Sequence, residues 1–120
     1  MDVLVVDDNP KVRLGLAKVL ERGGLLVRTA ENGLAAFAEL QKRSYKVVVC
    51  DIQMPFMDGL ELYQELQRLD PDAARRVVFV SAWLGVPEVR KFIEETGCRH
   101  LEKPFEISDF VRTVREVAAA

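Results

Sequence analysis

The sequence is poor in the features that mark secreted, membrane-spanning and nucleic-acid-binding proteins. Its 120 residues include two cysteines, one histidine and one tryptophan, and the longest uncharged run, residues 77–87, is too short to cross a bilayer. Seventeen Lys and Arg residues against nineteen Asp and Glu residues give a net charge of −2, which leaves no basic excess to attract nucleic acid. The chain starts without the basic segment and long apolar core of a signal peptide. Cys50 and Cys98 have neither the spacing of a metal site nor that of a CxxC motif. They suit a reducing cytosol, where cysteines remain free thiols. We therefore expect a soluble cytoplasmic protein with neither direct nucleic-acid binding nor membrane insertion.

Short apolar runs alternate with amphipathic stretches five times along the chain. The runs, which we predict to be strands, are residues 3–6, 25–27, 47–50, 77–80 and 100–101. The first, third and fourth are continuously apolar, which is typical of central strands in a parallel sheet buried on both faces. Asn9-Pro10 predicts the start of the first helix and Gly23-Gly24 its end. We predict one domain over residues 1–120, with a doubly wound α/β sheet covered by helices on both faces.

Polar side chains follow four of the five predicted strands, at the edge where ligands bind in open α/β sheets. They are Asp7 and Asp8 after the first run, Asp51 after the third, Ser81 after the fourth and Lys103 after the fifth. Three neighbouring carboxylates repel one another unless a cation joins them, and all-oxygen ligation suits Mg²⁺. A metal, a carboxylate nucleophile, a lysine and a hydroxyl are the groups needed to move a phosphoryl group onto an aspartate.

Each of these residues also has a simpler structural interpretation. Asp8 can belong to the helix start at Asn9-Pro10, Asp51 can be a turn residue, Lys103 a solvated loop lysine and Ser81 a small buried residue. Taken singly, these interpretations are favoured. Their positions at successive strand ends of one predicted sheet favour a single site.

The motifs resemble those of a receiver domain of two-component signalling. The resemblance rests on residues 4–10 around the acidic pair, residues 49–59 around Asp51 and residues 102–105 around Lys103-Pro104, and it extends over essentially the whole chain. It implies a five-stranded flavodoxin-like (βα)5 sheet of order 2-1-3-4-5 and an often cis Lys103–Pro104 bond. Residues 86–105 look most like receivers attached to sensor histidine kinases.

The resemblance also implies a role for each motif residue. Asp51 would accept a phosphoryl group from a phosphohistidine of a sensor histidine kinase or histidine phosphotransfer protein, with no external substrate turned over. Ser81 would be the switch hydroxyl, and Lys103 would pair with the phosphoryl group. Mg²⁺ would be held by Asp8, Asp51, the backbone carbonyl of Gln53 and, through water, Asp7.

The sequence departs from the usual receiver pattern at His100, where receivers usually carry Tyr or Phe. A hydrogen-bonded strand-edge histidine, a smaller rotamer switch and a phosphoryl carrier are the three interpretations of this residue. Trp83, two residues after Ser81, is expected to act as a lid that lengthens the life of the phosphoryl group and as a fluorescent reporter of the switch.

Two surfaces are candidates for partner proteins. Met54, Phe56 and Met57 form an apolar strip beside Asp51 that either contacts a kinase or, for Met54, packs in the core. The face formed by the predicted fourth helix, fifth strand and fifth helix is expected to contact a downstream protein.

Two other functions use the same residues. A degenerate receiver would be a phosphorylation-independent interaction module, and it would not need Asp8, Asp51, Ser81 and Lys103 together. A metal-dependent phosphohydrolase would need an acid two residues after its nucleophile, where this chain has Gln53.

Overall fold

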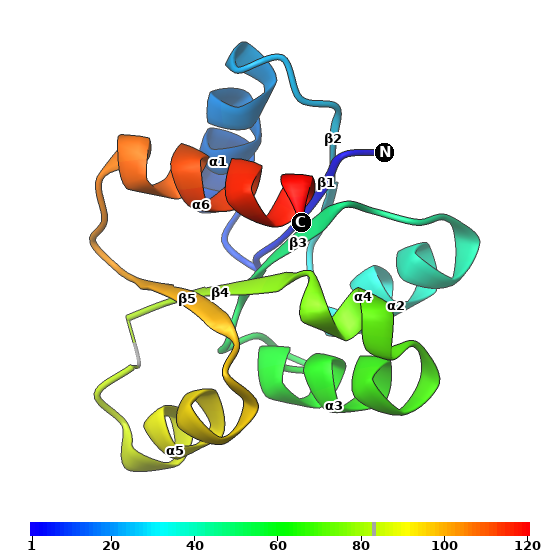
Figure 1. The fold of residues 1–120 in the computed structure, drawn as a ribbon, viewed down its shortest axis with the longest axis vertical. Coiled ribbons are helices and arrows are strands. Elements are labelled where there is room, and N and C mark those ends of the chain that lie inside the picture. The colour runs from blue at the N-terminus through cyan, green and yellow to red at the C-terminus, as the bar shows by residue number, and fades with distance from the viewer. Residues whose placement is uncertain (83) are drawn as a thin grey trace.

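The structure is a computed structural model that describes residues 1–82 and 84–120. Five parallel strands form one sheet in the order β2-β1-β3-β4-β5, and helices cover both of its faces (Figure 1). This confirms the predicted fold class and strand order. Along the chain the elements are β1 (Val3–Val6), α1 (Pro10–Arg22), β2 (Val27–Ala30), α2 (Gly33–Lys42), β3 (Val47–Asp51), α3 (Gly59–Leu69), α4 (Pro71–Arg75), β4 (Val77–Ser81), α5 (Pro87–Thr96), β5 (Arg99–Glu102) and α6 (Ile107–Ala119).

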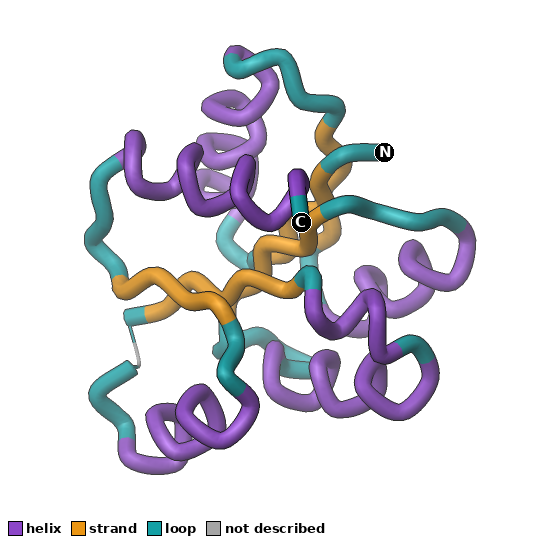
Figure 2. Tube along the Cα trace, viewed as in Figure 1, coloured by secondary structure: helices purple, strands orange, loops and turns teal. Residues whose placement is uncertain are grey.

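Two apolar clusters lie on opposite faces of the sheet because successive strand residues point to opposite sides. On one face, alternate residues of the central strands pack with α1 and α6, through side chains such as Leu20 and Phe110. On the other face, the remaining strand residues pack with α2, α3, α4 and α5, and Phe79 is fully buried among them. Figure 2 shows the strands as a layer between these two sets of helices. The continuous apolar runs are therefore buried on both faces, as predicted.

The first helix begins and ends where the sequence indicates. The side chain of Asn9 accepts hydrogen bonds from the backbone N–H groups of Lys11 and Val12, and Pro10 is the first helical residue. Gly23 follows the last helical residue, Arg22. The same chemistry produces α4, a short helix that was not predicted. There Asp70 caps Ala73 and Pro71 opens the helix.

The two edge strands differ from their predicted limits. β2 covers Val27–Ala30 instead of residues 25–27, and it pairs with β1 in the register Val3↔Val27. Its middle residues, Arg28 and Thr29, are polar and exposed, so the apolar run at residues 25–27 indicated the strand but not its limits. β5 extends over Arg99–Glu102, two residues longer than predicted, and pairs with β4. Among the described residues, no helix is long and apolar enough to cross a membrane.

Candidate functional site

The site lies at the carboxyl edge of the sheet, where β1 and β3 are neighbours. Asp7 and Asp8 follow β1, and Asp51 is the last residue of β3. One carboxylate oxygen from each of the three lies within 4.8 Å of the others. Asp7 is buried and Asp8 is exposed, so the cluster opens from the sheet toward the surface. The sequence analysis therefore identified three side chains that the fold brings together.

Lys103, which follows the edge strand β5, extends its side chain to this cluster. Its Nζ atom lies 3.4 Å from Asp51 Oδ2 and 3.5 Å from Asp7 Oδ2. The backbone of Lys103 is fixed by its N–H, which donates to the carbonyl of Ser81 at 2.9 Å. The Lys103–Pro104 bond is cis, as the resemblance implies. One ammonium group thus faces two of the three carboxylates.

The charges of the site remain unbalanced even with Lys103 present. Burial raises the pKa of the Asp51 carboxyl above its usual value, Lys103 opposes this shift and the nearby Asp7 adds to it. The site holds three carboxylates that offer only oxygen donors, and an excess of negative charge that a divalent cation would offset. These residues fit Mg²⁺, which prefers carboxylate oxygens and retains several waters.

Backbone and side-chain hydrogen bonds hold the acidic loop in place. The N–H of Asn9 donates to Asp7 Oδ1 at 2.9 Å, and Arg13 Nη1 donates to the Asp7 carbonyl at 2.9 Å. The N–H of Gln53 donates to Asp51 Oδ1 at 3.4 Å. The sequence analysis did not identify Arg13, although its place one turn into α1 is a signal that could have found it.

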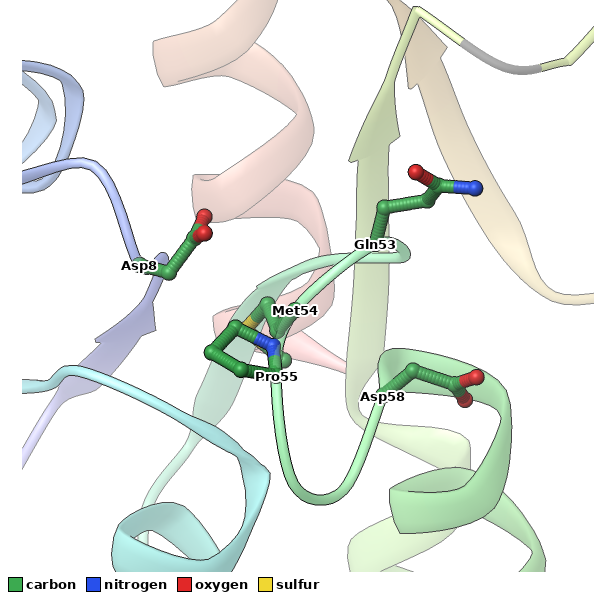
Figure 3. Close-up of a pocket in the computed structure, with 5 residues that line it drawn as sticks. All are labelled: Asp8, Gln53, Met54, Pro55 and Asp58. Carbon is green, nitrogen blue, oxygen red and sulfur yellow. The ribbon is translucent and has the colours of Figure 1, made fainter.

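A shallow pocket of about 360 Å³ opens beside the carboxylates (Figure 3). Asp8 faces the loop after β3 across this pocket, and the lining residues are Asp8, Gln53, Met54, Pro55 and Asp58. Met54 and Met57 are half-buried against the core, which supports the packing interpretation of Met54. Phe56, by contrast, is 77% exposed.

Two glycines fix the loop that follows Asp51. A Cβ atom on Gly59 would lie 2.5 Å from the Asp51 carbonyl oxygen, and the N–H of Gly59 donates to the Ile52 carbonyl at 2.8 Å. A Cβ atom on Gly33, at the start of α2, would overlap the carbonyl oxygen of Met57. In the sequence, Asn32-Gly33 and Asp58-Gly59 are ordinary turn signals, and neither close approach is visible without the fold.

The two predicted switch residues, Ser81 and His100, have different environments. Ser81 is fully buried at the end of β4. His100 is exposed on the edge strand β5, with Nδ1 3.2 Å from the Cys98 carbonyl oxygen, so one ring nitrogen has a hydrogen-bonding partner. A cavity of about 240 Å³ is lined by Leu84, Arg90, Ile93, Glu94, His100 and Glu102. Trp83 lies outside the described residues, and its lid and reporter roles stay predictions.

The match to known proteins agrees with this geometry. Residues 3–115 match the family model described as the response regulator receiver domain. The chain belongs to this family. Receiver domains are signalling modules of two-component systems that are generally phosphorylated, bind Mg²⁺ and work with sensor kinases, often attached to downstream effector domains.

This chain matches nearly the whole length of some relatives and only a small part of others. The response regulator receiver protein CpdR of Brucella abortus is 30% identical over 98% of this chain and 97% of CpdR. The sensor kinase CckA of the same organism is 32% identical over 96% of this chain, which spans 12% of CckA. The response regulator TrrA of Thermotoga maritima, solved in complex with Mg²⁺-BeF, has a TM-score of 0.83 and 28% identity over 98% of this chain and 99% of TrrA.

Removing one carboxylate should stabilise the metal-free protein. We expect Asp8→Asn to raise its thermal midpoint by a few degrees, since about 1 kcal/mol of relieved repulsion is worth about 4 °C in a domain of this size. The parent should gain stability when Mg²⁺ is added, and the variant should gain much less, because it has lost an oxygen ligand with full charge. Scanning calorimetry with and without Mg²⁺ checks both expectations. An equal Mg²⁺ response in parent and variant would remove Asp8 from the metal site.

Proposed function

We propose that this receiver domain, spanning residues 1–120, is a phosphoacceptor switch or relay module whose Asp51 takes a phosphoryl group from a phosphohistidine. The observation that carries the proposal is the cluster of three carboxylates with the Lys103 ammonium 3.4 Å from Asp51. A structural lysine–aspartate pair would need one carboxylate, whereas here Lys103 faces two and a third, Asp8, lies beside them.

The transfer exchanges one bond to phosphorus for another. An oxygen of the Asp51 carboxylate attacks phosphorus, the bond from phosphorus to the donor's imidazole nitrogen breaks, and the imidazole leaves with that electron pair. Asp8, Asp51 and the backbone carbonyl of Gln53 would hold Mg²⁺, with Asp7 acting through water. The ion supplies charge neutralisation at the phosphoryl oxygens. Lys103 reaches the same edge and can pair with a phosphoryl oxygen of the product, while the Ser81 hydroxyl can donate to another.

The domain would assist its own phosphorylation and dephosphorylation without turning over an external substrate. Gln53 stands two residues after Asp51, and an amide side chain cannot act as the general acid of a phosphohydrolase. We further propose that the face formed by α5, β5 and α6 contacts a downstream protein. Ser81 and His100 would change conformation when Asp51 is phosphorylated. The protein would work in the cytoplasm.

A small phosphodonor tests the proposal directly. Acetyl phosphate with Mg²⁺ should label the chain with up to one acid-labile phosphoryl group, and labelling should fail when EDTA removes the metal. A phosphohydrolase would instead release phosphate steadily without accumulating a labelled chain, and a degenerate receiver would neither be labelled nor release phosphate. Either of these two results would overturn the proposal.

Lys103→Ala should impair signalling more than folding. The ammonium group faces carboxylates at the end of the sheet, so its loss leaves the two apolar clusters intact, but the cation that would contact the phosphoryl group is removed. We expect at least a tenfold smaller phosphorylation-induced change in affinity for a downstream protein, equivalent to about 1.4 kcal/mol. Lys46→Ala, an exposed lysine paired with Asp2 away from the site, is the control. A full response in Lys103→Ala would show that Lys103 does not respond to the phosphoryl group.

A further inference from the structure

Phe56 combines two features that are unusual for an aromatic residue. Its side chain is 77% exposed, more than any other large hydrophobic residue among those the structure describes. Its φ angle is +69°, and within the described ranges it is the single residue other than glycine with a positive φ. A bulky residue in the left-handed region is strained, and Gly or Asn would occupy it at lower cost. The protein thus bears a strained backbone to carry an exposed ring, and such strain concentrates at functional sites.

The loop that carries Phe56 is fixed on both sides. Immediately after Phe56, the Met57 backbone packs against Gly33 of α2 so closely that no side chain fits at Gly33. Asp58 then caps α3, accepting a hydrogen bond from the Glu61 N–H at 2.9 Å, and the Gly59 N–H donates to the Ile52 carbonyl. The backbone that carries the Phe56 ring is therefore fixed before any partner binds, which lowers the entropy cost of a contact made by the ring.

The same loop forms the rim of the pocket beside Asp51. Met54, Pro55 and Asp58 line this pocket opposite Asp8 (Figure 3), so Phe56 lies in sequence between two lining residues. A protein that brings a phosphoryl group to Asp51 must cover part of this rim, whereas a small phosphodonor need not. A second exposed apolar residue, Leu34, follows Gly33 directly and is 52% exposed.

We propose that Phe56 is an anchor for the protein phosphodonor, packing against an apolar side chain of the donor near its phosphohistidine. This assignment rests on the proposed function of Asp51. An uncharged ring next to a strongly acidic site contributes affinity through apolar burial, and aromatic side chains dominate such contacts. Phe56 is thus a specificity-determining contact and takes no part in the chemistry.

The test compares two donors on matched variants. Phe56→Asn removes the ring but keeps a residue that tolerates a positive φ, and Phe56→Tyr keeps the ring. Leu26→Ala removes an apolar side chain that is 63% exposed and lies before β2, at the opposite edge of the sheet. Each protein is labelled with acetyl phosphate and with a panel of phosphorylated histidine kinases and histidine phosphotransfer proteins.

We expect Phe56→Asn to slow transfer from the protein donors at least about tenfold while acetyl phosphate labels it within about twofold of the parent. Phe56→Tyr and Leu26→Ala should behave like the parent with both donors. The proposal is overturned if Phe56→Asn slows both donors equally or neither, or if no protein donor labels a parent that acetyl phosphate does label. It is also overturned if sedimentation shows a parent dimer that Phe56→Asn dissociates, since a second copy would then cover the ring. Failure of acetyl phosphate to label the parent would instead refute the role of Asp51.

Discussion

Asp51→Asn is expected to abolish labelling of the protein by acetyl phosphate and Mg²⁺, a loss of at least about 1,000-fold, as for removal of a catalytic nucleophile. Asparagine is nearly the same size as aspartate, so β3 and the loop after it should keep their positions. The amide oxygen lacks the negative charge that makes the carboxylate a nucleophile. Lys103 would keep Asp7, 3.5 Å from its Nζ atom, as a partner. Phosphoprotein electrophoresis after a fixed labelling time measures the effect.

A carboxylate outside the site provides the control for this experiment. Asp72→Asn changes an exposed aspartate of α4 whose side chain pairs with Arg75. It removes one negative charge from the surface without touching the site, so labelling should match that of the parent. Labelling of Asp51→Asn at the parent rate, mapped to Asp7 or Asp8, would mean that the phosphoacceptor had been wrongly assigned. Circular dichroism confirms that both variants remain folded.

The candidate site was predictable from the sequence because it depends on strand ends. β1 and β3 are buried on both faces and so read as continuous apolar runs, which placed Asp7 and Asp51 at one edge of the sheet. Their proximity then follows from the pairing of β1 with β3, since parallel neighbours end together. The Lys103 contact depends on the sheet order, which came from the resemblance of the motifs and not from periodicity.

Close contacts between two backbone segments, the limits of an edge strand and a very short helix could not be predicted from the sequence. Gly33 and Gly59 resemble ordinary turn glycines in the sequence, and only the fold shows that each leaves no space for a side chain. The edge strand β2 carries exposed polar residues, so the apolar run before it indicated a strand at residues 25–27 instead of Val27–Ala30. The short helix α4 was hidden because an Asp-Pro pair can open either a turn or a helix.

Gly33→Ala is expected to destabilise the protein by about 2–3 kcal/mol, the cost of overpacking a site that cannot expand freely. The added methyl group would overlap the Met57 carbonyl oxygen and lie 2.7 Å from the Met57 carbonyl carbon and Cβ atom. Backbone atoms cannot move aside as a flexible side chain can, so α2 or the loop after β3 must shift. Because that loop lines the pocket beside Asp51, we also expect slower labelling by acetyl phosphate.

Gly15→Ala provides a control of opposite sign. Gly15 lies inside α1, and apart from the adjoining helix backbone and chain neighbours no atom lies within 4 Å of a Cβ atom placed on it. Alanine there removes only the conformational freedom of glycine, which should stabilise the helix by about 0.5–1 kcal/mol. Urea unfolding followed by circular dichroism measures both variants. If Gly33→Ala stabilises the protein as Gly15→Ala is expected to do, the contact between Gly33 and Met57 is looser than the structure shows. The loop would then be free to relax, and the backbone support for the strained Phe56 would be lost with it.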